Sequence, residues 1–514
     1  MTDGPRPVAD PKPPAEDEVS PDGEQTLARS VRHGAVWALA ANIVMRFASV
    51  AVTAILARLL SKEDFGIFAV ALAVYLVVAS LAELGMASAV ARSPLEPEEI
   101  APTIASISIL ASVGIATAMA VGAPLIASAL GQPGAAEPIR VLAICLVLTG
   151  IFAVPGAQLV REFRQDKIFL GTVVGFLVAN PILVVLALHG GGATSFAWSR
   201  VIGQLATGLV FVLSTSRRYW PRWRREVVRP LLRFGLPLSI ANLVNWTLLN
   251  ADYMILGRLV DAAQIGVYVI AFNVANWSTA VLGSVLNSVV VPAFGRVADD
   301  RERLGAALVS AAGLVAAVAL PIAAVSAALA RPLVVTVFGA RWSEASPVLV
   351  VLAVYGGLYA FSLLFANVLV ATGQTVRLLL VQLGWVLVLV PGIVLGVRWA
   401  GLQGVAWAHV VTIGLIAVPA YGVAVLRATG QRPAALLRAG AGPLLAALLA
   451  AGAARLTSAA FSTAWLALLV GGLAAGLVYL VAIAPTAIRR LPDRYLPGWL
   501  PHWARRARDA AAAR

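Results

Sequence analysis

Apolar runs of 20 residues or more follow one another along the chain, separated by short polar segments. They do not alternate between apolar and polar positions, so they predict helices rather than strands. Only helices and closed barrels satisfy the backbone in a bilayer, and a helix needs about 20 apolar residues to cross it. We predict fourteen spans, at residues 34–57, 66–90, 103–130, 138–160, 168–188, 194–214, 235–257, 264–291, 304–329, 345–371, 376–397, 401–426, 437–457 and 463–485.

An internal repeat divides these spans. The sequence ILARL at Ile55–Leu59 recurs as ILGRL at Ile255–Leu259, and ten of the 31 positions in 41–71 are identical to their partners in 241–271. Chance would give about three such identities in so apolar a chain. Further matches at offsets of 209 and 210 extend each copy to six spans. Because six is even, the copies have the same topology, and an internally doubled apolar chain is typical of a secondary transporter.

The expected fold is an all-α polytopic membrane protein with two parallel six-helix repeats, the N-lobe and the C-lobe, and two further helices. The predicted segments are a disordered cytoplasmic tail (1–33), the N-lobe (34–214), a basic cytoplasmic linker (215–234), the C-lobe (235–426), helices 13 and 14 (437–485) and a cytoplasmic interfacial tail (486–514).

Composition and charge agree with a membrane protein. Hydrophobic residues make up 60% of the chain and charged residues 12%, whereas soluble proteins are closer to a quarter charged. With the N-terminus inside, 27 Lys and Arg residues fall in or near the cytoplasmic segments and 8 in the outer loops. This bias predicts a multi-pass protein of the cytoplasmic membrane with both termini cytoplasmic. Seven arginines in the linker would hold it to anionic lipids, although their role as a plain topology determinant is favoured.

Several functional classes are excluded at this stage. The net charge of +14 lies in short loops between spans, so it does not indicate nucleic-acid binding. A single cysteine, Cys145, rules out an internal disulfide, and no Cys/His cluster has metal-ligand spacing. There is no phosphate-binding glycine loop and no nucleophile elbow, and the outer loops are short. We therefore expect a protein that is not an enzyme and has no catalytic residues, metal or cofactor.

Polar side chains gather on single faces of several spans. Such groups are costly in a membrane, so they usually face a cavity or a partner. The predicted substrate cavity is lined by Asn42, Arg46, Arg200, Gln204, Asn242, Asn245, Asp252, Asn273, Asn276 and His409. The alternative is that the stripes join helices by hydrogen bonds worth about 0.6 kcal/mol each. Both interpretations stay open for the asparagines.

The arginines favour the cavity interpretation, because no acidic residue shares the helical face of Arg46 or Arg200. Guanidinium binds phosphate and carboxylate in bidentate fashion, so such a cavity favours an anionic ligand. Asp252 could pair with either arginine or take part in ligand or proton coupling. Arg58 and Arg258 end the first and seventh spans on the outer side, where anchoring at the interface would account for them.

Several short motifs resemble the polysaccharide transporter family, the Wzx-type flippases of the multidrug/oligosaccharidyl-lipid/polysaccharide exporter superfamily. The motifs are Gly34-x-x-Trp37, Ile55–Leu60, Asp64–Gly66, Glu83–Gly85, Asn250–Tyr253, Gly257-Arg258, Phe338-Gly339-x-x-Trp342 and Ala371–Gly373. The resemblance covers residues 30–430. It implies two six-helix lobes around a cavity with alternating access, in which Arg46 and Arg200 are the candidates to meet a diphosphate or acidic sugars.

The implied function is transfer of a polyprenyl-diphosphate-linked oligosaccharide across the cytoplasmic membrane for surface polysaccharide synthesis, such as lipopolysaccharide, capsule or exopolysaccharide. The energy source would be a proton, sodium or the membrane potential. The expected partners are the lipid-linked oligosaccharide, anionic lipids, and polymerase or glycosyltransferases of the same pathway. Two alternatives stay open: a drug or cation antiporter of the same fold, and a non-transporting scaffold of a glycan-assembly complex.

Overall fold

The computed structural model describes residues 45, 48–82, 97–277, 279, 283, 294, 295, 297 and 300–490. The chain divides into Met1–Val50 and Ala51–Arg514, and every contact reported below lies within the second unit. In the described residues the regular elements are all helical, as the apolar pattern predicts. Ten of these helices are long and apolar enough to cross a membrane. The count of fourteen stays a prediction.

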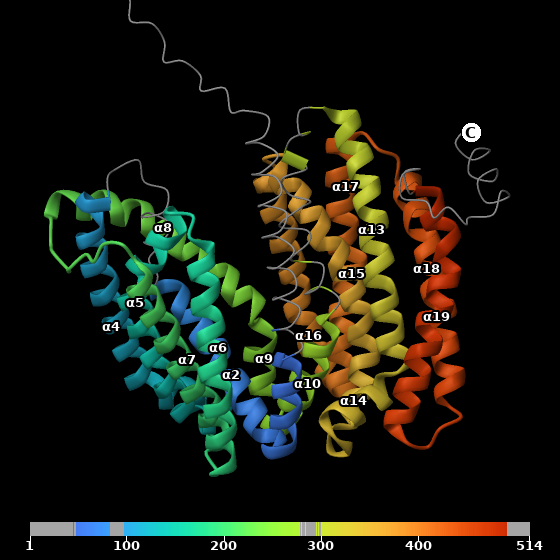
Figure 1. The fold of residues 1–514 in the computed structure, drawn as a ribbon, viewed down its shortest axis with the longest axis horizontal. Coiled ribbons are helices and arrows are strands. Elements are labelled where there is room, and N and C mark those ends of the chain that lie inside the picture. The colour runs from blue at the N-terminus through green and yellow to red at the C-terminus, as the bar shows by residue number, and fades with distance from the viewer. Residues whose placement is uncertain are drawn as a thin grey trace, which may run out of the picture. The chain divides into compact units, whose positions relative to one another are not determined.

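The first half, residues 51–214, contains five long helices after the short apolar helix Ala48–Leu59. They are α2 (Lys62–Ala82), α4 (Pro97–Ala129), α5 (Ala136–Arg161), α6 (Gln165–Leu188) and α7 (Gly192–Ser214). Helices α4 and α5 pack together, as do α6 and α7, and α5 packs on α7 (Figure 1). A Cβ added to Gly175 in α6 would lie 2.8 Å from the carbonyl oxygen of Gly203 in α7, so small residues let these two backbones approach closely.

The second half, residues 225–429, has more breaks than the sequence pattern predicts. Its elements are α8 (Arg225–Leu249), α9 (Ala251–Leu259), α10 (Ala262–Ala275), α13 (Arg301–Ala328), α14 (Ala330–Phe338), the short η3 (Ala340–Trp342), α15 (Ala345–Ala371), α16 (Thr375–Thr412), η4 (Ile413–Ala417) and α17 (Val418–Thr429). The predicted span 235–257 is thus two helices that meet at Asn250, and α8 begins ten residues earlier than predicted.

Helix α16 covers two helical segments that turn at Ala400 and Gly401, where Gly401 has φ of +56°. A Cβ added to Gly404 would lie 1.9 Å from the carbonyl oxygen of Gly396. The two segments therefore fold back on each other beside the turn. This agrees with the two predicted spans 376–397 and 401–426. A single π-helical turn, η4, follows directly after Thr412.

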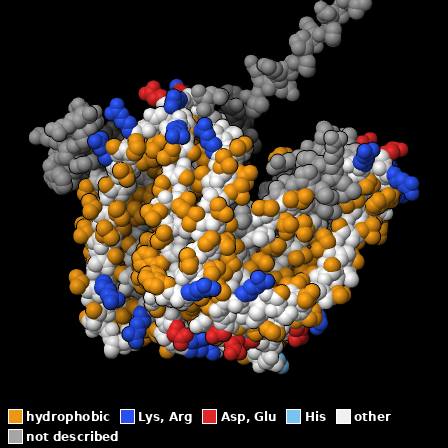
Figure 2. All heavy atoms as spheres, turned by 180° about the vertical axis from the view of Figure 1, so that it is seen from behind, with side chains coloured by type: hydrophobic (Ala, Val, Ile, Leu, Met, Phe, Trp, Pro, Cys, Tyr) orange, Lys and Arg blue, Asp and Glu red, His pale blue; other side chains and the backbone are white. Residues whose placement is uncertain are grey.

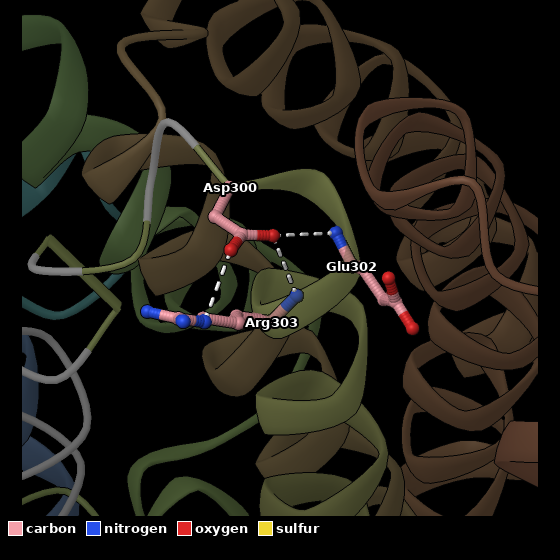
Figure 3. A network of polar contacts seen from close by, with 3 residues as sticks. All are labelled: Asp300, Glu302 and Arg303. Carbon is pink, nitrogen blue, oxygen red and sulfur yellow. Dashed lines mark hydrogen bonds and ion pairs between the residues drawn. The ribbon is translucent and has the colours of Figure 1, made fainter.

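Helix α13 illustrates how a polar residue sets a helix start. The Asp300 carboxylate accepts hydrogen bonds from the backbone N–H groups of Glu302 at 3.1 Å and Arg303 at 3.0 Å, and it pairs with the Arg303 guanidinium at 3.1 Å (Figure 3). These bonds satisfy donors that the helix leaves open in its first turn. Helix α13 therefore starts at Arg301, directly after Asp300 and three residues before the predicted apolar span.

The linker before α8 is held by the first half. Arg217 pairs with Glu98 at the start of α4, and the Arg222 N–H donates to the Pro102 carbonyl at 3.0 Å. Trp220 and Trp223 are 77% and 53% exposed. Exposed tryptophans among arginines are typical of a segment at a membrane interface.

The outer surface of the molecule is strongly apolar. Helices α18 (Pro433–Ser458) and α19 (Ala464–Arg490) pack on each other, and their free faces carry leucines such as Leu437 and Leu473, 73% and 67% exposed. Figure 2 shows hydrophobic side chains over the middle of the visible face and most charged ones toward its upper and lower rims. A soluble protein would bury such a surface. The chain is a multi-pass membrane protein.

Candidate functional site

A cavity of about 270 Å³ lies within the second half and is lined by residues of α8, α9, α10, α15, α16 and α17. Three residues of the predicted substrate cavity, Asp252, Asn276 and His409, line it. The break between α8 and α9 at Asn250 brings Asp252 into the first turn of α9. Asp252 and His409 are only 5% and 4% exposed. The fold thus brings three of the polar residues that the sequence pattern singled out to one cavity.

Tyr268 joins two of them. Its hydroxyl donates to the Asp252 carboxylate at 3.0 Å and lies 3.0 Å from His409 Nε2. One hydroxyl proton cannot serve both neighbours, so with the tyrosine donating to the carboxylate, the imidazole is placed to donate to the tyrosine oxygen. The Asp252 carboxylate also accepts a hydrogen bond from the Tyr253 N–H at 2.9 Å. Asp252, Tyr268 and His409 thus form a buried hydrogen-bonded chain.

Aromatic rings continue from this chain along one side of the cavity. Tyr355 lies 5.1 Å from the His409 ring and 5.6 Å from the Tyr359 ring, centroid to centroid, and Trp385 follows at 6.2 Å from Tyr359. Three atoms of lining residues, His409 Nδ1, Ser362 Oγ and Trp385 Nε1, are buried without a hydrogen-bond partner among the described residues. Buried polar atoms normally find partners. These three are exceptions among the residues beside the cavity.

Across the part of the chain that the structure describes, no three His, Cys, Asp or Glu side chains are grouped closely enough to hold a metal ion.

A second polar group lies in the first half, between α2, α5 and α7. The Arg200 guanidinium lies over the Tyr75 ring, 5.0 Å from its centroid. Tyr75 itself is buried, whereas Arg200 is exposed. Among the described residues no carboxylate lies within ion-pair distance of Arg200. The ring fixes the arginine by a cation–π contact and leaves its charge for another partner.

Gln204 lies one turn further along α7 from Arg200 but turns into the protein. Its amide nitrogen donates to the Thr149 hydroxyl at 2.7 Å and to the Cys145 carbonyl at 3.1 Å. This side chain joins α7 to α5, as the hydrogen-bond alternative for the polar stripes describes. Cys145 is free and buried.

The other predicted cavity residues are more scattered. Asn242 is half-buried in α8, and Asn273 is exposed on α10; neither is among the described lining residues. The side chain of Asn245, and the whole of Asn42 and Arg46, lie outside the described residues. Two groups, one in each half, thus hold the other described candidates, and a single central cavity stays a prediction.

The structure adds contacts that bear on two expectations for charged residues. Asp252 does not pair with Arg200: its described partners are Tyr268 and the Tyr253 N–H, because Arg200 stacks on Tyr75 in the other half. Arg58 and Arg258 do more than anchor at an interface. Arg58 Nη2 donates to the Thr336 carbonyl at 3.1 Å, and Arg258 Nε to the Ala129 carbonyl at 2.7 Å. Each guanidinium finds a backbone acceptor in the half opposite its own.

Sequence reasoning missed the tyrosines that complete both groups. Tyr75 in α2 and Tyr268 in α10 each lie in the second predicted span of their copy of the repeat. Tyr75 contacts Arg200 and Tyr268 contacts His409. Arg200 and His409 lie in the sixth predicted spans and are 209 residues apart, the offset that relates the two copies there. Their apolar surroundings hid them, since a tyrosine in an apolar run adds little to a polar stripe. A tyrosine in the second span of both copies was the available signal.

Comparison with known proteins gives a consistent family. Residues 55–347 match the family described as polysaccharide biosynthesis protein. The succinoglycan biosynthesis transport protein ExoT of Rhizobium meliloti is 30% identical over 62% of this chain and 65% of its own, so the match spans just under two thirds of that relative. The lipopolysaccharide biosynthesis protein WzxC of Escherichia coli is 24% identical over 74% of this chain and 78% of its own.

Solved structures show the same fold at low sequence identity. The lipid II flippase MurJ, in an inward closed conformation, aligns with a TM-score of 0.70 at 14% identity over 86% of this chain and 98% of its own. A multidrug resistance MATE family transporter of the MOP superfamily, in an inward-facing conformation, aligns with a TM-score of 0.61 at 17% identity over 74% of this chain and 94% of its own. The expected resemblance is confirmed: the chain belongs to the polysaccharide biosynthesis protein family and has the MOP superfamily fold.

Proposed function

We propose that this protein moves a polyprenyl-diphosphate-linked oligosaccharide from the inner to the outer leaflet of the cytoplasmic membrane during surface polysaccharide synthesis. The observation that carries the proposal is the exposed Arg200, held over Tyr75 in a span of the first half with no carboxylate partner among the described residues. Relatives named as polysaccharide transport and biosynthesis proteins support the substrate class. Transport would proceed by alternating access between the two halves.

Arg200 suits the diphosphate of such a lipid. A guanidinium stays charged and offers five donors in a planar fork that matches phosphate oxygens. The Tyr75 ring limits the freedom of the side chain, so less conformational entropy is lost when a ligand binds. An uncharged sugar would gain less from this group than a phosphate would.

The Asp252–Tyr268–His409 chain is the proposed coupling site. A buried carboxylate without a basic residue among its described hydrogen-bond and ion-pair partners is a candidate for reversible protonation in a membrane transporter. Tyr268 links it to an imidazole, and a change in proton occupancy would change which hydrogen bonds the chain can make. Protonation could then bias the two-state equilibrium between conformations, which is what a coupling ion must do.

A transport assay with the purified protein tests the proposal. Proteoliposomes would carry a fluorescent polyprenyl-diphosphate oligosaccharide, and a membrane-impermeant quencher would report its appearance in the other leaflet. We expect flipping above the protein-free rate, acceleration by an imposed proton gradient, and competition by unlabelled diphosphate lipid. Flipping that stays at the protein-free rate with folded protein would remove the proposal.

A drug or cation antiporter of the same fold is the competing function, and the aromatic cavity that contains Asp252 is the feature that favours it. The two functions are distinguished in cells. Loss of the gene should build up the lipid-linked precursor on the inner leaflet if the protein is a flippase. It should instead raise sensitivity to toxic organic cations, with normal surface glycan, if the protein is an antiporter. A non-transporting scaffold would give no flipping in liposomes.

A further inference from the structure

The repeated segments around Arg58 and Arg258 meet each other at one end of the molecule. A Cβ added to Gly66 would lie 1.8 Å from the Ala262 carbonyl oxygen, and one added to Gly266 would lie 2.0 Å from the Lys62 carbonyl oxygen. Lys62 and Ala262 are themselves 200 residues apart, as the two glycines are. Helices α2 and α10 therefore approach each other through the same positions of the two copies, where any side chain beyond hydrogen would collide with backbone.

The ends of the preceding helices are capped in the same reciprocal way. Arg341 and Trp342 Nε1 donate to the Ala57 carbonyl, at 3.0 Å from Arg341 Nε and 2.7 Å from the indole, and Arg341 also donates to the Leu60 carbonyl. In the other copy, Gln132 Nε2 donates to the carbonyls of Gly257 at 3.0 Å and Val260 at 3.1 Å. These two acceptors are the repeat partners of Ala57 and Leu60. Helix-end carbonyls lack partners in their own helix, and here the opposite half supplies them.

The two repeat arginines complete the pattern. Arg58 of the first half donates to Thr336 in α14, and Arg258 of the second half donates to Ala129 at the end of α4. Lys62 also pairs with Glu344 at 2.8 Å, and the Phe65 and Trp342 rings pack edge to face at 5.1 Å. We call these contacts between the halves the crossed contact. The charge count predicts that it lies on the outer side of the membrane.

We propose that the crossed contact is a reversible gate, in which Arg58 and Arg258 hold the outer ends of the halves together while the protein is open to the inner side. The inference rests on the proposed alternating access. When the two halves separate, the arginine side chains exchange their carbonyl acceptors for water. The contact can therefore form and break without leaving a buried charge unpaired. The two copies of the repeated motif then form the two sides of one gate. Anchoring at the membrane interface does not explain why the two copies contact each other.

The role can be tested by pulsed EPR on protein in nanodiscs. In a Cys145→Ala background, spin labels at Glu137→Cys and Trp399→Cys would report the separation of the outer ends of the two halves; both positions are exposed. For the Arg58→Gln/Arg258→Gln variant we expect the ratio of long to short distances to rise by at least about tenfold, as loss of charge-assisted hydrogen bonds predicts. The Arg58→Lys/Arg258→Lys variant should restore part of the short population.

The matched control is Arg331→Gln/Arg455→Gln, which removes two exposed charges from the same predicted side. A distance distribution in the Arg58→Gln/Arg258→Gln protein equal to that of this control would overturn the gate. A second variant, Gly66→Ala, should also favour the long distance, whereas Gly114→Ala should not, because an added Cβ there meets nothing within 4 Å. If the Arg58→Gln/Arg258→Gln variant shows no change in spin-label distance while the protein flips the lipid, the gate is wrong and the proposed function stands. If the distance changes but the protein never flips the lipid, the proposed function is wrong and the gate stands.

Discussion

The two halves place different chemistry at positions that the repeat relates. In the first half, Arg200 is exposed and lies over Tyr75 with its charge unpaired among the described residues. In the second half, His409 is buried and shares Tyr268 with Asp252. One group is accessible and basic, and the other is enclosed and can gain or lose a proton. Under the proposed function, the first-half group suits binding of an anion and the second-half group suits coupling.

The largest effect is expected from Asp252→Asn. The substitution keeps the size of the side chain and removes the carboxylate that accepts from Tyr268, so proton-driven flipping should fall to the rate without a gradient. The measurement is the initial rate of lipid flipping in proteoliposomes with and without an imposed proton gradient. Asp166→Asn, at an exposed aspartate of the first half, should keep the gradient response. An unchanged response in Asp252→Asn would place coupling elsewhere.

Arg200→Gln is expected to have the next largest effect, and to affect ligand binding but not coupling. Charge-assisted hydrogen bonds contribute about 1.5–3 kcal/mol, so we expect the affinity for a diphosphate lipid to fall about 10- to 100-fold, while the response to a proton gradient remains. Arg200→Lys should recover only part, since an ammonium lacks the planar fork. Binding of the labelled lipid to nanodiscs would measure this, with Arg140→Gln as a control at another exposed arginine. Equal lipid affinity in Arg200→Gln and Arg140→Gln would show that Arg200 does not contribute to recognition of the lipid.

Tyr268→Phe tests the second half by stability. The change removes the hydroxyl between Asp252 and His409, and a buried polar group left unsatisfied costs about 1–3 kcal/mol. Thermal unfolding in detergent should therefore begin at a lower temperature. Tyr75→Phe keeps the aromatic face under Arg200, so its unfolding temperature should change less. The opposite order would mean that the first-half tyrosine, not Tyr268, holds the more important hydrogen bonds.

The contrast between the halves also shows what a sequence can predict here. Helix positions followed from long apolar runs, and α15 matches its predicted span of 345–371. The stripe pattern found Asp252 and His409 because a polar side chain in an apolar run is conspicuous. It could not find Tyr268, whose role depends on α10 packing beside α9 and on its hydroxyl reaching His409 of α16. It also could not reveal the acceptors of Arg58 and Arg258, because these are backbone carbonyls, which every residue has.

The smallest effect is expected from Gln204→Leu, which separates hydrogen-bond support from ligand binding in the first half. The substitution removes the bonds to Thr149 and the Cys145 carbonyl and should lower the free energy of unfolding by about 1 kcal/mol. Lipid affinity should stay unchanged, because the amide faces α5 while Arg200 is exposed. Unfolding and lipid binding would be measured on the same preparation. A loss of affinity with unchanged stability would instead assign Gln204 to the substrate cavity and extend the anion site one turn along α7.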